Sequence, residues 1–363
     1  MPIDAAFRMA PELTTTVPSQ QGLQWGIILA GGEGIRMRSL IKSWLGENRP
    51  KQYCTFAGSR SMLQHTLDRA AALLGETQLL TIIGAGHWAY VDGAVGTCHG
   101  SLVEQPSNRG TAPGVLLPLS FILDRDPEAT VLVLPSDHFV YPEERFNRYA
   151  ANAITLAEQH PDHLVLMGAI PDGPETDYGW IEPGKSLSNV STSDRPSEVR
   201  SFLEKPSRDA AQTLFENQWL WNTMIVAAKA KVLWASARTL IPSVVESLDN
   251  FRVVLRAVRE GRAPQEHVDI ALAHAYQRIP SADFSRDILQ NAARKSLVLP
   301  IEGVRWSDWG RPERIWETLS FLGVQPALPA NGWRAPHARH AARDRMENEL
   351  SAPKTWGKLA NTP

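Results

Sequence analysis

A glycine-rich stretch directly after a short apolar run constrains this chain more than any other feature of its sequence. The apolar run at residues 25–30 predicts a buried β-strand. Glycines occupy positions 31, 32 and 34, and glycines at the end of a strand permit a tight turn whose backbone N–H groups approach a ligand closely. Arg36 and Lys51 follow, and their charges suit a bound polyphosphate. The stretch therefore predicts a phosphate-binding loop, with an ordinary strand-to-helix turn as the alternative.

Two common phosphate-binding fingerprints are missing from this stretch. It contains no G-x-x-x-x-G-K-[ST] pattern, and Met37 stands where the third glycine of a dinucleotide fingerprint would fall. The loop by itself therefore does not identify the ligand.

Composition excludes several classes of function. The chain has 363 residues, 43% of them hydrophobic, which is enough for one large domain or two modest ones. Its net charge of -2 gives no basic surface for nucleic acid or for an anionic membrane. Two cysteines provide no disulfide framework, and the sequence has neither a secretory signal pattern nor an apolar run long enough to span a bilayer. We expect a cytoplasmic protein without nucleic-acid or membrane partners.

The order of apolar segments predicts α/β construction. Residues 61–74 have helical spacing, and residues 79–83 and 131–134 are apolar runs typical of buried strands. Asp137 closely follows the last of these strands, at the position where parallel α/β sheets collect their chemistry. A carboxylate there is a candidate Mg²⁺ ligand, with a helix-cap or turn residue as the alternative. We expect the neighbouring His138 to be a packed histidine outside the catalytic set.

Seven short motifs are spread over the chain. They are Gly-Gly-Glu-Gly-Ile-Arg at 31–36, Pro-Lys-Gln at 50–52, Glu-Gln-Pro-Ser-Asn-Arg-Gly-Thr-Ala-Pro at 104–113, Tyr-Gly-Trp-Ile at 178–181, Glu-Lys-Pro at 204–206, Trp-Asn at 221–222 and Trp-Ser-Asp-Trp-Gly at 306–310. Over residues 24–322 the chain thereby resembles the sugar-1-phosphate nucleotidyltransferases, above all their mannose-1-phosphate guanylyltransferase branch.

The resemblance implies a fold and a domain organisation. We expect a Rossmann-like, three-layer α/β/α nucleotidyltransferase domain with a central, mostly parallel mixed sheet over residues 24–325. A disordered arm at residues 1–23 would precede it, and a polar, disordered tail at residues 326–363 would follow it.

The resemblance also implies roles for individual residues. Arg36 would hold the leaving phosphates, Lys51 would stabilise charge at the α-phosphate, and Asp137 would complete the catalytic set. Asp137 and Asp308 would bind Mg²⁺, with Mn²⁺ as an alternative ion. The nucleotide would contact Leu29, Ala30, Gly31, Gly32, Gly34, Asn108, Arg109, Thr111 and Ala112. The sugar phosphate would contact Tyr178, Gly179, Glu204, Lys205 and Asn222.

The reaction implied is GTP plus mannose 1-phosphate giving GDP-mannose and pyrophosphate. Departures from the family pattern keep alternatives open. Ile35 and the 37–39 segment differ from the usual loop, the segment between Arg36 and Lys51 is longer, and Met224 stands where the family keeps a glycine. The alternatives are UTP or dTTP with glucose 1-phosphate, or a non-catalytic regulatory paralogue that binds nucleotide sugar. A homo-oligomer is also left open.

Overall fold

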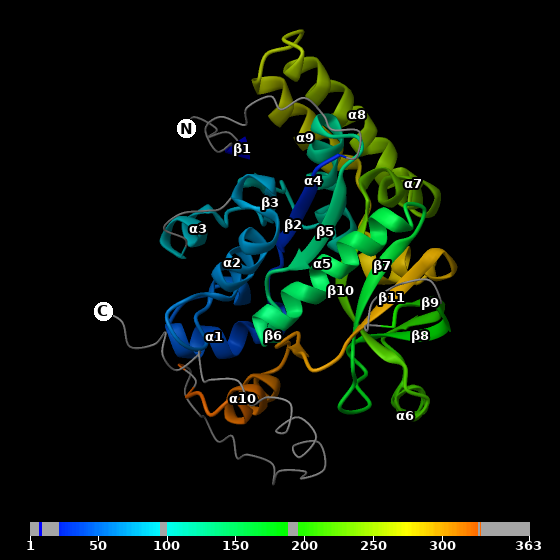
Figure 1. The fold of residues 1–363 in the computed structure, drawn as a ribbon. Helices are drawn as coiled ribbons and strands as arrows, with labels where there is room; N and C mark the ends of the chain where they lie inside the picture. Colours follow the sequence, from blue (N-terminus) through cyan, green and yellow to red (C-terminus); the bar gives the residue numbers. More distant parts are fainter. Residues whose placement is uncertain (1–6, 9–21, 95–99, 188–194, 326, 328–363) are drawn as a thin grey trace.

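The computed structural model describes residues 7–8, 22–94, 100–187, 195–325 and 327. Within these residues, ten strands form one mixed sheet in the order β1-β4-β3-β2-β5-β10-β7-β11-β9-β8, and β10 also pairs with β8 (Figure 1). The strands are β1 (Phe7–Arg8), β2 (Gln24–Ala30), β3 (Leu79–Ile83), β4 (Ser101–Glu104), β5 (Thr130–Pro135), β7 (Leu164–Ala169), β8 (Gly179–Ser186), β9 (Ser197–Glu204), β10 (Leu220–Lys229) and β11 (Ser296–Ile301).

Helices cover both faces of this sheet. Because side chains alternate along a strand, Ile27 of β2 packs in one apolar cluster and Ile28 in the other. The three-layer α/β/α arrangement around a mixed sheet is therefore confirmed. One face carries α2 (Met62–Leu74) and α5 (Glu143–Gln159), and the other carries α4 (Thr111–Arg125), α7 (Ala230–Leu240), α8 (Pro242–Arg259) and α9 (Glu266–Arg278). The shorter α3 (Trp88–Ala94) and α6 (Arg208–Glu216) follow β3 and β9.

The direction of the strands gathers their ends at one edge. Strands β4, β3, β2 and β5 run parallel, so their carboxyl ends meet at the same edge. Strand β10 runs antiparallel to β5 and β7, and β7 pairs in parallel with β11. The glycine loop, the loop after β4 and the loop with Asp137 all begin at this edge, as expected for a ligand site in an α/β sheet.

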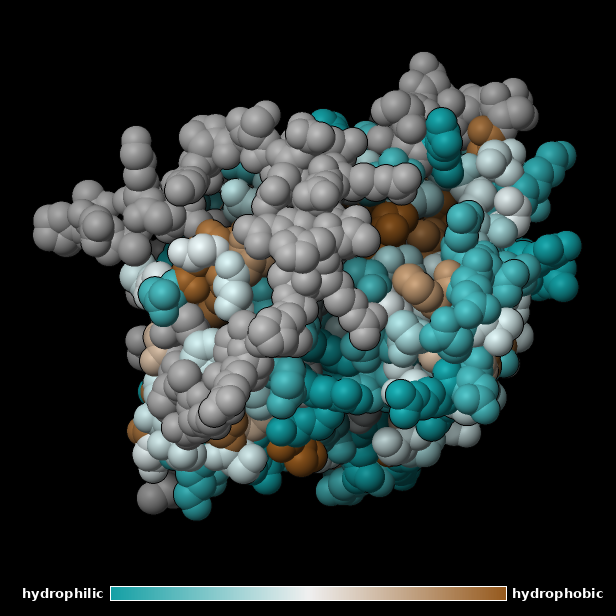
Figure 2. Space-filling model, turned by 90° about the horizontal axis from the view of Figure 1, so that it is seen from below, coloured by the Kyte–Doolittle hydropathy of each residue, from teal (hydrophilic) through white to brown (hydrophobic). Residues whose placement is uncertain are grey.

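A third apolar cluster closes this edge. It combines Met37 and Ile41 with Phe139, Trp309 and side chains of the last helix. The cluster joins η1 (Ile35–Met37), α1 (Arg38–Leu45), β6 (Phe139–Tyr141) and α10 (Pro312–Phe321). Strand β6 pairs with β12 (Arg305–Ser307) in a two-stranded sheet, and η2 (Lys51–Tyr53) directly precedes Cys54 of the cluster. Figure 1 places α1 and α10 at the bottom of the molecule, and Figure 2 shows that end as mainly hydrophilic where it is not grey. The longer segment after Arg36 thus folds as a helix anchored by its apolar side.

The predicted arm and tail lie almost wholly outside the described residues, so their disorder stays a prediction. The exceptions are β1, which pairs antiparallel with β4 at the sheet edge, residues 22–23, of which the Leu23 N–H donates to Asp126 Oδ2 at 2.6 Å, and Ala327, whose N–H donates to the Phe56 carbonyl at 2.8 Å. No helix in the described ranges is long and apolar enough to cross a membrane.

A close contact between distant segments fixes the loop after β4. The Ala112 N–H donates to the Ala282 carbonyl at 3.1 Å, and the Ala282 N–H donates to the Arg109 carbonyl at 3.0 Å. Gly110 adopts a left-handed φ of +90°, and a Cβ there would lie 2.3 Å from the Ala282 carbonyl oxygen. Both observations demand glycine at position 110. These bonds hold the loop beside η4 (Phe284–Leu289). Two further short helices are η5 (Ala293–Lys295), which follows η4, and η3 (Glu76–Gln78), which precedes β3.

We predict that Gly110→Ala lowers the free energy of unfolding by roughly 2 kcal/mol or more, because the left-handed backbone and the carbonyl contact both penalise a Cβ. Urea denaturation measures the change. Gly173→Ala is the control, since nothing lies within 4 Å of a Cβ at Gly173. Equal stability of the two variants would contradict the assignment.

Candidate active site

The Pro-Lys-Gln turn is hydrogen-bonded to the glycine loop. Gln52 Nε2 donates to the carbonyl oxygens of Ala30 and Gly32, each at 2.8 Å, and the Tyr53 hydroxyl donates to Ala30 at 3.2 Å. Gln52 is buried, so loss of these hydrogen bonds would leave its amide unsatisfied away from water. The carbonyls at the end of β2 are therefore occupied by protein, and the loop keeps its shape without a ligand.

Position 34 of the loop requires glycine, and position 31 leaves little room for a side chain. A Cβ at Gly31 would lie 2.5 Å from Nε2 of the buried Gln105, and that amide also donates to the Gly31 carbonyl at 3.3 Å. Gly34 has a left-handed φ of +59°, and a Cβ there would lie 3.1 Å from the Lys51 backbone nitrogen. The loop is thus packed between the amide side chains of Gln52 and Gln105. The sequence alone predicts no role for either residue.

Lys51 lies at the centre of the site. Its side chain is only 4% exposed, and its Nζ lies 2.9 Å from Asp137 Oδ2. The same Nζ donates to the backbone carbonyl of Asp308. A buried ammonium group is costly unless it is paired and hydrogen-bonded. Lys51 therefore joins the two carboxylate residues predicted from separate motifs.

A small antiparallel sheet holds these two carboxylates in register. Asp137 precedes β6 and Asp308 follows β12, and Phe139 pairs with Ser307 across the two strands. The Phe139 and Trp309 rings stack with their centroids 4.8 Å apart. Trp309 has a left-handed φ of +44°, which is unusual for a bulky residue. Aromatic packing thus stabilises the turn that places Asp308.

The Asp308 carboxylate is densely hydrogen-bonded. Its Oδ1 accepts from the Tyr178 hydroxyl at 2.9 Å, the Gly310 N–H at 2.9 Å and Arg314 Nη1 at 2.6 Å. Its Oδ2 accepts from Arg36 Nη2 at 3.0 Å. Burial raises the pKa of this carboxyl, but the charges of Lys51 and Arg314 outweigh that effect. The pKa therefore lies well below its usual range. Asp308 is therefore ionised at neutral pH.

The second carboxylate is also ionised. Burial raises the pKa of the Asp137 carboxyl, and the neighbouring Lys51 ammonium outweighs that effect, so the pKa falls below its ordinary value. The Asp137 side chain is 40% exposed and accessible to a ligand. His138 lies behind it, with its imidazole edge-on to Trp306 at a centroid distance of 5.2 Å.

This donor set fits Mg²⁺. In the described residues, no group of three or more His, Cys, Asp or Glu side chains converges as a complete metal site. Mg²⁺ commonly takes one or two carboxylates and completes its shell with phosphate oxygens and water. Asp137 and Asp308, ionised and joined through Lys51, match that requirement. The metal remains a prediction.

The described chain agrees with one family of proteins over most of its length. The family model described as "Nucleotidyl transferase" matches residues 25–324. The chain belongs to the nucleotidyl transferase family. Its similarity to individual members is modest. Mannose-1-phosphate guanylyltransferases from Escherichia coli and Klebsiella pneumoniae are 26% and 27% identical, and both alignments cover 85% of this chain. The chain spans 62% of the length of these curated relatives.

Structural comparison gives the same fold. A crystal structure from Thermus thermophilus, of a protein named mannose-1-phosphate geranyltransferase, is similar with a TM-score of 0.66. The two proteins are 26% identical, and the match covers 81% of this chain and 79% of the other. The nucleotidyl transferase fold predicted from the sequence motifs is therefore confirmed.

In this nucleotidyl transferase, the predicted sugar side begins at Glu204, the last residue of β9. A Cβ at Gly179 would lie 2.4 Å from Glu204 Oε2, so glycine makes room for the carboxylate. This Oε2 is buried and has no hydrogen-bond partner among the described residues. Lys205 Nζ lies 3.8 Å from the other oxygen. Burial raises the pKa of Glu204 to about 7, although the Lys205 charge lowers it in part.

We predict that Glu204→Gln makes the protein more stable at pH 8 but not near pH 4. The pKa of Glu204 rises from 4.5 to about 7 on folding, so stability falls as pH increases through that window. The variant escapes this loss, which is on the order of 2 kcal/mol. Urea unfolding at both pH values measures it, and the exposed Glu246→Gln is the control. A difference of equal size at both pH values would contradict the assignment.

Asn222, another of the predicted sugar contacts, makes hydrogen bonds within the protein. Its Nδ2 donates to Ser285 Oγ at 3.1 Å, and its Oδ1 accepts from the Met224 N–H at 3.0 Å. The ladder of β10 with β7 is irregular between Asn222 and Val226, and Met224 has a left-handed φ of +59°. The backbone at position 224 therefore favours glycine, and this chain accommodates methionine there.

Other predicted residues also contact protein groups. The Thr111 hydroxyl accepts from the Phe284 N–H at 2.7 Å, and Asn108 Oδ1 accepts from the Gly110 N–H at 2.9 Å. Ala112 is fully buried. The Leu29 carbonyl accepts from the Ser136 hydroxyl at 2.7 Å. The predicted nucleotide segment after β4 is thus well ordered by internal bonds, and its contact with nucleotide stays a prediction.

Sequence reasoning missed four charged residues around Asp308. Arg314 Nη2 lies 2.6 Å from Glu175 and 3.2 Å from Asp177, while its Nη1 holds Asp308. Arg311 Nη2 lies 2.6 Å from Asp177. A usable signal existed in the sequence, because arginines at the start of a helix oppose the helix dipole and need another reason to be there.

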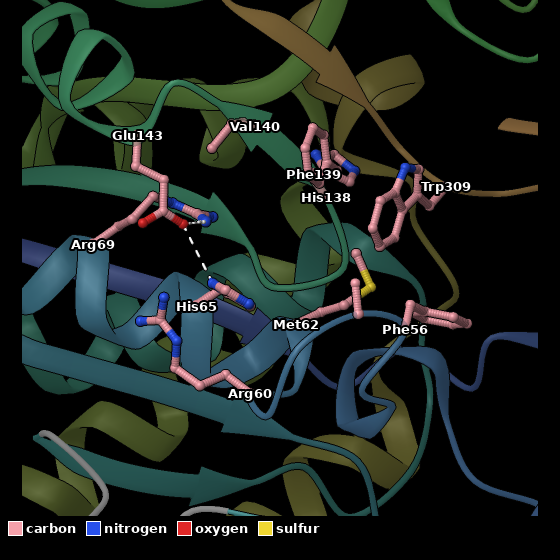
Figure 3. Close-up of a pocket in the computed structure, with 11 residues that line it drawn as sticks. Phe56, Arg60, Met62, His65, Arg69, His138, Phe139, Val140, Glu143 and Trp309 are labelled. Atoms are coloured by element: carbon pink, nitrogen blue, oxygen red, sulfur yellow. Dashed lines mark hydrogen bonds and ion pairs between the residues drawn. The ribbon is translucent and has the colours of Figure 1, made fainter. Parts of the chain in front are cut away.

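A pocket lies behind the Asp137 turn. Figure 3 shows His65, Arg69 and Glu143 at one end and Phe56, Met62 and Trp309 at the other. Glu143 Oε1 lies 3.4 Å from His65 Nδ1 and 3.1 Å from Arg69 Nη1. Burial raises the pKa of Glu143, but these two neighbours hold it at about 2. The pocket is not lined by Lys51, Asp308 or the glycine loop. It is therefore separate from the candidate active site.

Proposed function

We propose that this protein transfers a nucleotidyl group from a nucleoside triphosphate to a hexose 1-phosphate, with GTP and mannose 1-phosphate as its substrates. The observation that carries the proposal is the buried Lys51 ammonium between Asp137 and Asp308 at the carboxyl edge of the sheet. Family membership supports the reaction type. The names of the similar curated proteins support the choice of guanine and mannose.

The reaction requires positioning more than covalent help from the protein. A phosphate oxygen of the sugar phosphate attacks the α-phosphorus, the bond to the bridging oxygen breaks, and pyrophosphate leaves with its electron pair. In this proposal, Lys51, which contacts Asp137, neutralises charge at the α-phosphate, and Arg36 leaves Asp308 to bind the departing phosphates. Mg²⁺, held by Asp137 and Asp308, would supply further charge neutralisation. No side-chain nucleophile is needed.

Gln105 supports a base contact near Gly31. Its Oε1 is buried and lacks a hydrogen-bond partner within the described part of the chain. A carboxamide oxygen accepts hydrogen bonds, so this atom suits a base with a ring N–H. Guanine, uracil and thymine share that feature. The preference for GTP over UTP or dTTP therefore depends on the curated relatives.

The first test is pyrophosphate release by purified protein with Mg²⁺, crossing GTP, UTP, ATP and dTTP with the 1-phosphates of mannose, glucose and galactose. We expect release with GTP and mannose 1-phosphate. Release with another pair would keep the reaction and change the substrates. Silence for every pair, with GDP-mannose still binding in calorimetry, would instead favour the regulatory paralogue.

We predict that Asp137→Asn lowers kcat by roughly 100-fold or more, because it removes a charge that faces the reacting phosphates and Lys51. Lys51→Met should have a similar effect for the complementary reason. Asp162→Asn, at an exposed turn before β7, is the control and should keep normal turnover. Circular dichroism verifies that each variant is folded. Normal turnover in Asp137→Asn would remove this residue from the mechanism.

A further inference from the structure

Two exposed arginines from distant parts of the chain converge on one carboxylate beside the site. Arg311 Nη2 lies 2.6 Å from Asp177 Oδ2, and Arg36 Nη1 lies 3.5 Å from the same oxygen. The side chains of Arg311 and Arg36 are 50% and 57% exposed, whereas Asp177 is 25% exposed. Two like charges are therefore held next to each other on the solvent side of a single anion.

The backbone between the two elements is shaped for this approach. A Cβ at Gly310 would lie 2.6 Å from Arg36 Nη2. The Arg36 guanidinium therefore packs against the backbone of Gly310, the residue before Arg311, where a side chain would leave no room for it. Pro312 then begins α10, and Arg311 occupies its N-cap with an extended φ of -136°. The position of Arg311 beside Arg36 is thus set by chain geometry as well as by charge.

Stability alone gives a weak reason for this arrangement. Exposed ion pairs contribute little to folding. Asp177 Oδ2 also lies 3.2 Å from the buried Arg314, so Arg36 and Arg311 are additional cations on an oxygen that already has a partner. Guanidinium groups bind phosphate oxygens in a fork geometry, and an anion with several oxygens would satisfy both arginines better than one shared carboxylate oxygen.

We propose that Arg311 is a second phosphate-binding residue, which binds the pyrophosphate portion of the nucleotide together with Arg36. Asp177 holds the two guanidinium groups in place in the free protein and releases them to phosphate oxygens when the ligand binds. This inference rests on the proposed function, since it assigns Arg311 to the leaving group of that reaction.

The competing explanation is that Arg311 only braces the loop that carries Asp177. The two explanations differ in the effect of Asp177→Asn. If Asp177 competes with phosphate for the arginines, its neutralisation should leave pyrophosphate affinity unchanged or increase it. If the ion pair is merely a brace, Asp177→Asn should weaken binding as much as Arg311→Ala does.

The test measures binding of inorganic pyrophosphate to the full chain by calorimetry, with and without Mg²⁺. We expect Arg311→Ala to raise Kd by roughly tenfold or more, as for loss of a charge-assisted hydrogen bond, and Arg311→Lys to lie between it and the parent protein. Binding of mannose 1-phosphate should not change. Arg200→Ala is the matched control, because Arg200 is an exposed arginine paired with Glu182 on β8.

An unchanged pyrophosphate Kd in Arg311→Ala, equal losses in Arg311→Ala and Asp177→Asn, or no pyrophosphate binding by the parent protein would each overturn the inference. The outcome separates from that of the proposed function. Arg311-dependent pyrophosphate binding by a protein that turns over no substrate pair would keep this assignment and reject the reaction. Turnover together with an unchanged Kd in Arg311→Ala would do the reverse.

Discussion

The buried ammonium of Lys51 is the interaction on which the rest of the site depends. It contacts the Asp137 carboxylate and the Asp308 backbone carbonyl, and so connects the loop after β5 to the turn after β12. Removing a charge from water is costly, and these contacts repay the cost only while both segments stay in place. The surrounding architecture serves that requirement: β6 and β12 fix the register, and the Phe139–Trp309 stack holds the turn.

The charges around this centre are arranged in exchangeable pairs. Arg36, Arg311 and Arg314 contact Asp177 and Asp308, while Arg314 also reaches Glu175. In the proposed reaction, a triphosphate with a divalent cation would bring partners of both signs, and its binding would replace one set of ion pairs by another. The free protein therefore keeps its cations oriented and keeps its carboxylates ionised, which would limit the reorganisation needed in the proposed reaction.

Much of the fold could be predicted because it depends on local patterns and on motifs with fixed spacing. The apolar runs at β2, β3 and β5 and the glycine loop predicted these strands and the sheet edge at which their loops begin. Residues that act through long-range pairing could not be predicted. Nothing near Asp177 or Arg311 reveals that they meet, and Gln105 looks like an ordinary loop residue until its amide is seen against Gly31. The structure likewise shows that the amide of Asn222 is engaged with Ser285 and Met224, which no spacing could indicate.

The left-handed backbone at Trp309 has a wider consequence. Its ring packs in the apolar cluster that also includes Met37 and Ile41 after the glycine loop, and this cluster is separate from the two clusters that cover the faces of the sheet. The packing at this edge is therefore made by different side chains from those that cover the central sheet. Evolution could therefore tune the site through this cluster. Substitutions among its aromatic and aliphatic side chains would change how firmly Asp137 and Asp308 are held, without replacing any residue proposed to contact a substrate.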